Sequence, residues 1–225
     1  MGIEWYDRIA RRNGGYKGRA IFNVIGRSAE EVFEVRLKEL LPGCEWVLDA
    51  GCGHGEFTLK MAPHTGHITG FDNSAEMIAI AQKLMNASDV HNIEFVYATT
   101  KTELPFADGQ FDLIYDRRGP TSIIEHSRIL RAGGIIIGIH NDVSKVKERL
   151  SSSAYTDVEF EEYHDAVYEF PIEVEFSKFL ADTPGNPDYT QPAYRALLEQ
   201  KIQEHTTDGK LTIREHRYIW KAMKR

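Results

Sequence analysis

The feature that most constrains this chain is a regular alternation between short apolar runs and segments with helical periodicity. Each apolar run is rich in Val, Ile, Leu or Phe and has the length of a buried β-strand. Strands that are separated by helices form βαβ units, in which neighbouring strands are parallel and the crossovers are right-handed. The predicted strands are residues 46–50, 67–71, 93–97, 111–115 and 135–139.

The segments around these runs carry helix signals. Ser28 is followed by Glu31 in the spacing of a capping box, and apolar residues then recur at helical spacing until Pro42. Further helices are expected at residues 56–61, 74–85 and 121–130. Because helices then cover both faces of a parallel sheet, we predict an α/β fold with a three-layer, doubly wound, mostly parallel sheet.

The last third of the chain follows a different pattern. We expect a helix at 144–152, a strand at 163–170, a helix at 191–204 and a final strand at 211–223, antiparallel at the C-terminal edge of the sheet. This third shows neither a linker nor a core of its own, and a length of 225 residues fits one large domain. We therefore expect a single domain over residues 1–225, made of an N-terminal segment (1–27), a core (28–140) and a sheet edge with a covering insertion (141–225).

Composition and charge narrow the possible classes of function. With 42% hydrophobic and 27% charged residues, the chain should be globular and soluble. Cys44 and Cys52 are too few for a disulfide framework and lack zinc-site spacing, which favours a metal-free protein of the reducing cytoplasm. No apolar stretch is long enough to span a membrane, and a net charge of -7 disfavours binding to long nucleic acids. Residues 155–177 carry eight acidic and no basic residues, which we interpret as a solvated face rather than an acidic docking site.

A glycine-rich turn follows the first predicted strand, in the sequence VLDAGCGHGEF. Gly51, Gly53 and Gly55 alternate with other residues, so the main chain is open to a ligand, and the next helix offers free N–H groups. Tight packing alone would explain the glycines. It would not explain Asp49, because a carboxylate at the end of a buried strand costs free energy unless it has a partner.

A second acidic residue, Asp72, stands at the tip of the next strand, about twenty residues further on. A carboxylate in this place can accept hydrogen bonds from both hydroxyls of a ribose, which predicts nucleoside binding. The glycine spacing is G-x-G-x-G rather than the G-x-G-x-x-G of nicotinamide enzymes. An oxidoreductase of that kind is therefore the least supported interpretation.

Four blocks of sequence between about residues 45 and 140 together resemble the class I S-adenosylmethionine-dependent methyltransferases. They are VLDAGCGHGEF, ITGFDNSAEMIAIAQ, ELPFADGQFDLIYDRRGP and RILRAGGIIIGIH, in the order typical of that family. The resemblance implies a Rossmann-like, seven-stranded sheet and S-adenosylmethionine as the cofactor.

The resemblance also implies roles for individual residues. The glycine turn would lie against the methionine part of the cofactor, Asp49 near its amino group, and Asp72 on the ribose hydroxyls. Asn73 and Met77 would flank the adenine. The full set of expected cofactor contacts is Asp49, Gly51, Cys52, Gly53, Gly55, Asp72, Asn73, Met77, Thr99, Thr100 and Asp116.

One stretch departs from the family pattern. The family commonly has a Gly-Asp-Ala sequence after the third strand, where the aspartate binds the adenine amino group, whereas this chain has Tyr97-Ala98-Thr99-Thr100. A hydroxyl of Thr99 or Thr100, or a backbone carbonyl, can accept the same hydrogen bond.

The end of the fourth strand is expected to face the acceptor of the methyl group. Arg117 and Arg118 offer bidentate recognition of an anionic group, either on the substrate or on the carboxylate of the cofactor. They could instead form salt bridges with surface acids such as those at 155–177. His140, at the tip of the fifth strand, is a candidate general base, although a histidine there can also be an ordinary polar strand end.

The N-terminal segment combines aromatic and basic residues, and residues 1–27 carry a net charge of +4. In relatives such a segment often folds over the cofactor as a lid, which places Tyr6 and Tyr16 as candidate substrate contacts. An RNA-contacting patch is the alternative, because aromatic rings next to arginines can stack on bases.

These observations predict an enzyme that transfers a methyl group from S-adenosylmethionine to a small anionic or aromatic metabolite. An RNA base methyltransferase and a non-catalytic S-adenosylmethionine-binding protein are the alternatives. The sequence leaves open the methyl acceptor, the use of a general base and the oligomeric state.

Overall fold

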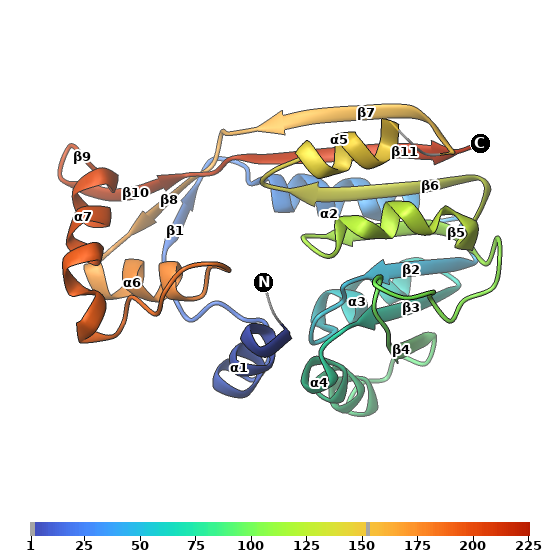
Figure 1. Cartoon of the computed structure of the whole chain (residues 1–225), viewed down its shortest axis with the longest axis horizontal. Coiled ribbons are helices and arrows are strands. Elements are labelled where there is room, and N and C mark those ends of the chain that lie inside the picture. Colours follow the sequence, from blue (N-terminus) through green and yellow to red (C-terminus); the bar gives the residue numbers. More distant parts are fainter. Residues whose placement is uncertain (1–2, 152–153) are drawn as a thin grey trace.

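The computed structural model describes residues 3–151 and 154–225, whose strands form two sheets (Figure 1). The larger sheet has seven strands in the order β4-β3-β2-β5-β6-β11-β7. Its strands are β2 (Trp46–Ala50), β3 (His67–Asp72), β4 (Ile93–Tyr97), β5 (Phe111–Arg117), β6 (Leu130–His140), β7 (Tyr155–Tyr163) and β11 (Arg217–Lys224). Strands β4, β3, β2, β5 and β6 are parallel, and β11 is antiparallel to both of its neighbours. The predicted mostly parallel α/β sheet is thus confirmed, and its antiparallel strand lies just inside the edge strand β7.

The strand ends reach further than the apolar runs that predicted them. Strand β3 includes Asp72, which pairs with Tyr97, and β5 includes Asp116 and Arg117, which pair with β6. Because these polar residues belong to the strands, their side chains point alternately to the two faces of the sheet. This extension decides which of them can reach a ligand.

Two layers of helices cover the larger sheet, and each has a separate apolar cluster beneath it. On one face, α2 (Ala29–Leu40), α3 (Glu56–Met61) and α4 (Ala75–Asn86) contribute to a cluster with Val47, Leu113 and Tyr115. On the other face, α5 (Ser144–Ser151) packs with Leu48 and Ile114. The capping box of α2 is present with both of its hydrogen bonds, as the sequence predicted.

The predicted helix at 121–130 is wrong in type. Residues Thr121–Ile129 form a 3-10 segment, η2, which is kinked at His126. A ring nitrogen of His126 lies 3.0 Å from the carbonyl oxygen of Thr100. This contact joins the kink to the loop that contains Thr100, and the segment leads directly into β6.

The expectation that the last third has no core of its own is also wrong. A second, four-stranded sheet has the order β1-β8-β10-β9, and a separate apolar cluster includes Phe170, Phe176, Leu180, Tyr189 and Leu198. Its elements are β1 (Asn23–Ile25), β8 (Val167–Phe170), α6 (Glu173–Ala181), η3 (Pro192–Tyr194), α7 (Arg195–His205), β9 (Thr206–Thr207) and β10 (Lys210–Arg214).

Two long ribbons of chain pass from one sheet into the other (Figure 1). The strand predicted at 163–170 corresponds to β8, and β7 was not predicted. The final strand predicted at 211–223 is divided into β10 and β11. The break between β10 and β11 contains Glu215, which is 3% exposed and accepts hydrogen bonds from the Ala29 amide at 2.7 Å and the Tyr168 hydroxyl at 2.6 Å. A buried carboxylate with these partners marks the point where the chain leaves one sheet for the other.

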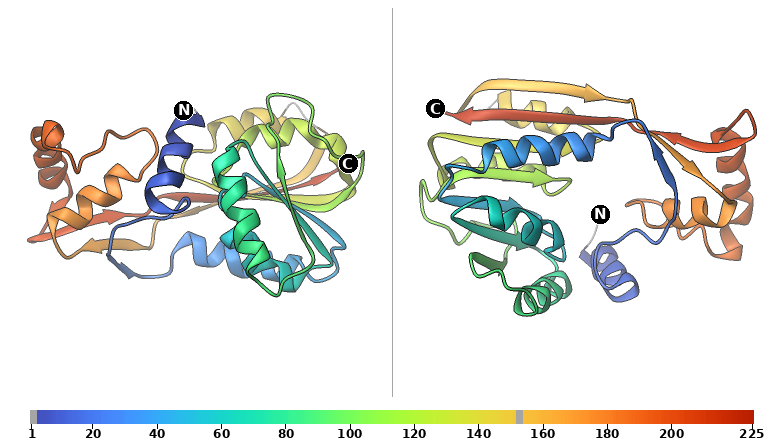
Figure 2. Two further views of the ribbon diagram at one scale, coloured as in Figure 1. Left: turned by 90° about the horizontal axis from the view of Figure 1, so that it is seen from below. Right: turned by 180° about the vertical axis from the view of Figure 1, so that it is seen from behind.

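The N-terminal helix α1 (Ile3–Asn13) joins the two halves of the molecule (Figure 2). On the side of the larger sheet, the Ser74 hydroxyl at the start of α4 donates to Asp7 at 2.5 Å. On the other side, Arg12 and Arg19 both bind Asp182, which caps α6. Within the described residues, no helix has both the length and the apolar character required to cross a membrane.

Candidate functional site

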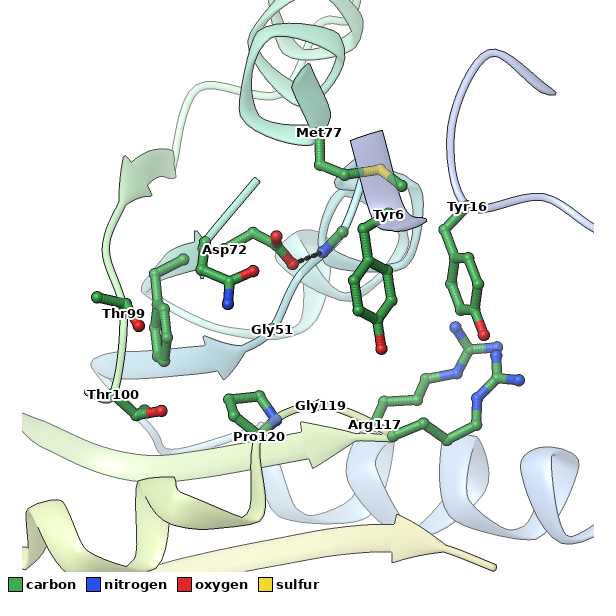
Figure 3. Close-up of a pocket in the computed structure, with 14 residues that line it drawn as sticks. Tyr6, Tyr16, Gly51, Asp72, Met77, Thr99, Thr100, Arg117, Gly119 and Pro120 are labelled. Atoms are coloured by element: carbon green, nitrogen blue, oxygen red, sulfur yellow. Dashed lines mark hydrogen bonds between the residues drawn. The ribbon is translucent and has the colours of Figure 1, made fainter. Parts of the chain in front are cut away.

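A cavity of about 170 Å³ opens at the carboxyl ends of β2, β3 and β5 (Figure 3). It brings together most of the residues that the sequence singled out. They are Tyr6, Tyr16, Gly51, Gly53, Asp72, Asn73, Met77, Thr99, Thr100, Arg117 and Arg118. Three further residues that were given no role, Phe71, Gly119 and Pro120, complete the wall.

Asp72 is held rigidly at the edge of this cavity. Its Oδ2 accepts a hydrogen bond from the Gly53 amide at 3.0 Å, and its Oδ1 accepts one from the Ser74 amide at 2.9 Å. Burial raises the pKa of the Asp72 carboxyl, and the backbone N–H groups partly counter this rise. A carboxylate has about four lone-pair sites, so it can accept further hydrogen bonds from a ligand.

The three glycines of the turn do not share one role. All have positive φ, at +81° for Gly51, +55° for Gly53 and +78° for Gly55. A Cβ at Gly53 would meet Tyr16 Cβ at 3.9 Å, on the side of the cavity, whereas one at Gly51 would lie 2.7 Å from Pro120 Cδ. A Cβ at Gly55 would lie 2.5 Å from Phe95 Cζ, and Gly55 lines neither this cavity nor the one beside it. Gly55 therefore serves internal packing, which corrects its predicted contact with the cofactor.

A second cavity of about 460 Å³ adjoins the first and contains Asp49 and Cys52. Asp49 is 2% exposed, and its Oδ2 accepts hydrogen bonds from the Thr58 hydroxyl at 2.6 Å and the Tyr115 hydroxyl at 2.8 Å. Burial raises the pKa of Asp49 to about 7, despite these two donors. Burial also raises the pKa of the Cys52 thiol well above its usual range, so this thiol is protonated near neutral pH.

Thr99 and Thr100 both lie on the wall of the first cavity, where the sequence placed them. The Thr100 hydroxyl is 2.6 Å from the Ser122 hydroxyl, and Thr99 Oγ1 accepts from the Lys101 amide at 3.3 Å. The contact of either side chain with adenine stays a prediction.

Asp116 and His140 lie behind the cavity rather than in it. Asp116 is fully buried, and its Oδ1 accepts a hydrogen bond from the Gly119 amide at 2.6 Å. His140 Nε2 lies 3.4 Å from Asp116 Oδ2, while His140 Nδ1 accepts from the Trp220 indole at 3.0 Å. Neither side chain lines either cavity. The structure therefore corrects the predicted cofactor contact of Asp116 and the candidate general base at His140: both support the turn that carries Gly119.

The two arginines pair with a residue that the sequence did not indicate. Arg117 Nε lies 2.7 Å from Glu30 Oε2, and Arg118 Nε lies 3.0 Å from Glu30 Oε1. The alternative that both arginines form salt bridges with an acidic residue is thus found in the structure, but the partner lies in α2 and not in the run at 155–177. Both arginines line both cavities.

Aromatic side chains of the N-terminal segment form one wall of the first cavity. The rings of Tyr6 and Tyr16 pack edge to face, with their centroids 6.0 Å apart, and Trp5 packs on Tyr6 at 5.1 Å. The Tyr16 amide donates to His54 Nδ1 at 3.2 Å, which ties this segment to the glycine turn. Burial raises the pKa of both tyrosine hydroxyls. The position predicted for Tyr6 and Tyr16 at the mouth of the site agrees with the structure.

Comparison with known proteins gives a family match over part of the chain. Residues 47–134 match the model of a family described as a methyltransferase domain. Residues 47–134 therefore carry a methyltransferase domain. This segment holds the glycine turn and the strands that surround the first cavity. Part of the chain is also 32% identical, over 88 residues, to a demethylmenaquinone methyltransferase of Listeria welshimeri. That match covers 38% of this chain and 37% of the relative, so the chain matches well under half of the relative's length.

Solved structures extend the likeness of this methyltransferase domain beyond the matched segment. A protein of unknown function from Deinococcus radiodurans R1 has 25% sequence identity and a TM-score of 0.72, and the alignment covers 99% of this chain and 100% of the other. A putative methyltransferase from Bacillus halodurans C-125 has 18% identity and a TM-score of 0.57, with 84% and 97% covered. The second likeness concerns the fold alone.

Proposed function

We propose that this protein transfers a methyl group from S-adenosylmethionine to a small acceptor that is anionic or aromatic. The observation that carries the proposal is the hydrogen bond between Asp72 and the Gly53 amide. It holds the Asp72 carboxylate, which would bind the ribose, beside the bare main chain of the glycine turn on one wall of the cavity. This wall stands at the carboxyl ends of parallel strands, where α/β proteins bind their ligands.

The residues present fit the proposed cofactor. Asp72 has unused lone pairs for two hydroxyls, and Asn73 and Met77 lie beside it on the same wall. The missing side chain of Gly53 leaves room for the cofactor's tail along the main chain. Asp49, which lines the adjoining cavity, would accept a hydrogen bond from the ammonium group of the methionine moiety. When bound, S-adenosylmethionine would supply a methyl group that its sulfonium has already activated.

The side chains around the site would then orient the acceptor and exclude water. Tyr6 and Tyr16 cover the cavity with rigid rings that lose little conformational entropy. An acceptor held in line with the methyl group gains most of its rate from positioning. Because His140 lies behind the cavity, it is not placed to take a proton from the acceptor.

Calorimetric titration with S-adenosylmethionine and S-adenosylhomocysteine tests the cofactor assignment. The wild-type protein should bind both, and Asp72→Ala should weaken both. Asp108→Ala is the matched control, because Asp108 is an 81% exposed acid whose partner, Arg128, lies outside both cavities. Failure of the wild-type protein to bind either nucleoside at millimolar concentration would refute the proposal.

Methyl transfer is tested separately, with a labelled methyl donor and a panel of small carboxylates, phosphates, phenols and short RNAs. A methylated small anion or phenol is the expected product. Labelled RNA alone would favour base methylation. Tight cofactor binding with no labelled product from any acceptor would favour the non-catalytic alternative.

A further inference from the structure

Arg117 and Arg118 are neighbours in sequence, yet both side chains reach the same carboxylate. Consecutive residues of a strand normally point to opposite faces. Arg117 is the last residue of β5, and Arg118 adopts a φ of +61°, a left-handed conformation that a long side chain seldom takes. The Arg118 amide donates to the Ile139 carbonyl at 3.1 Å, which holds this turn. The backbone therefore brings the two guanidinium groups together at a cost in conformational energy.

Glu30 pairs with both arginines at Nε: Arg117 Nε donates a hydrogen bond to it, whereas Arg118 Nε makes an ion pair without a hydrogen bond. One carboxylate oxygen faces Arg117 Nε and the other faces Arg118 Nε, at 2.7 and 3.0 Å. In the part of the chain that the structure describes, the terminal nitrogens of these two guanidinium groups make no hydrogen bond to protein. The arginine side chains are 31% and 33% exposed, so ligands can reach these nitrogens.

Aromatic rings fix the planes of both guanidinium groups. Arg117 Cζ lies 4.4 Å from the ring centroid of Phe57, and Arg118 Cζ lies 5.8 Å from that of Tyr16. Figure 3 shows Arg117 on the same side of the cavity as Tyr16. An arginine that is stacked and held at Nε loses less rotamer freedom when its outer edge binds a ligand.

Three arginines act electrostatically on Glu30. Burial raises the pKa of Glu30, but Arg118, Arg117 and Arg217 outweigh this effect and lower it. Arg217 approaches from β11, and its Nε is buried without a hydrogen-bond partner among the described residues. Arg217 thus adds a third cationic group that acts on Glu30, while Asp49 acts on Arg117 from the adjoining cavity.

We propose that the outer nitrogens of Arg117 and Arg118 form a binding site for a carboxylate or phosphate group, with Glu30 as the positioning residue that holds the pair. The site stands where the two cavities meet, because both arginines line both of them. The inference rests on the proposed methyl transfer, and it adds that one ligand of the reaction carries an anion at this point. That ligand is either the acceptor or the methionine end of the cofactor.

The two sources can be separated by calorimetry with three probes: S-adenosylhomocysteine, 5′-methylthioadenosine, which lacks the amino-acid tail, and inorganic phosphate. Arg117→Gln and Arg118→Gln are the test variants. Arg131→Gln is the matched control, because Arg131 is 53% exposed, pairs with Asp112 and lines neither cavity. If either test variant fails to fold, as judged by thermal unfolding, the corresponding lysine variant keeps the charge and removes the planar edge.

If the arginines hold the cofactor, the test variants should bind S-adenosylhomocysteine about ten- to one-hundredfold more weakly and 5′-methylthioadenosine as before. If they hold the acceptor, both nucleosides should bind normally, and phosphate binding to the protein saturated with S-adenosylhomocysteine should fall by a similar factor. The proposal is overturned if no probe loses more than about twofold in affinity relative to Arg131→Gln, or if both nucleosides lose affinity equally. A wild-type protein that binds neither nucleoside refutes the proposed function instead, and phosphate binding to the unliganded protein still tests the arginine pair.

Glu30→Gln tests the positioning role. Removing a negative charge next to two arginines should by itself strengthen the binding of any anion. Loss of the Glu30 contacts that hold the two arginines together should weaken anion binding, because the guanidinium groups can then move apart. We expect the anion identified by the first experiment to bind more weakly, and tighter binding would overturn the role of Glu30.

Discussion

Replacing Asp49 with Asn exchanges one carboxylate oxygen for an NH₂ group on a side chain that is only 2% exposed. Asn keeps an oxygen that can accept from the Thr58 and Tyr115 hydroxyls, which both bond to Asp49 Oδ2. The essential change is that Asn cannot ionise. Any difference between the two proteins that varies with pH therefore reports the titration of Asp49.

Burial raises the pKa of Asp49 from 3.8 to about 7. The folded protein therefore binds more protons than the unfolded chain between these two values, so its stability falls as the pH rises through this window and levels off above it. At about 1.4 kcal/mol for each pH unit between the two pKa values, the total loss is about 4 kcal/mol, of which about 2–3 kcal/mol falls between pH 5 and pH 8.

Urea unfolding of the ligand-free wild-type and Asp49→Asn proteins at pH 5, 6, 7 and 8 measures this difference. The wild-type protein should lose about 2–3 kcal/mol relative to the variant across that range. In Asp112, burial raises the pKa, but hydrogen bonds from Trp46, Glu45 and Arg131 outweigh it and the pKa is lowered. Asp112→Asn should therefore show a constant difference over the same range. If the wild-type and Asp49→Asn curves stay parallel to within about 0.5 kcal/mol, the reasoning is refuted.

Three further substitutions test other parts of the site. Asp72→Asn should weaken S-adenosylhomocysteine binding by about tenfold or more in calorimetry, because an NH₂ group must face one of two backbone N–H donors; unchanged affinity would contradict the role of Asp72. Gly119→Ala should lower the unfolding free energy by about 2 kcal/mol or more, since its Cβ would lie 2.2 Å from the Ala50 carbonyl oxygen; equal stability in urea would show that the turn can move. His140→Gln should lower the melting temperature, because His140 bonds to Trp220 behind the cavity, and it should leave the shape of the pH–rate profile unchanged. If one ionisation disappears from the profile of the variant, His140 acts as a general base after all.

Much of the fold was determined by local signals in the sequence. The strands at 46–50 and 93–97 and the helix at 56–61 have the predicted bounds. Short apolar runs between helical segments can be buried in few ways, so their order along the chain indicates a parallel sheet. The glycine turn and Asp72 could be assigned to the site because both follow directly from the ends of such strands.

The tertiary structure decided to which face of the sheet each side chain at the strand ends points. Strand β5 continues past residue 115, so the pleat buries Asp116 and leaves Arg117 to reach the cavities. When the pairing of a strand shifts by one residue, each side chain moves to the other face of the sheet. The amino-acid composition of the strand does not reveal such a shift. His140 is removed from the site in the same way, by its bond to Trp220.

Contacts between residues that are distant in sequence could also be identified only from the folded structure. Glu30 precedes Arg117 by 87 residues, and no local pattern connects the two. The apolar cluster beside the four-stranded sheet likewise draws on strands that had been assigned to one continuous sheet edge. Periodicity records which residues are buried near their own neighbours, whereas a contact between distant segments depends on how the whole sheet twists and where its ribbons separate.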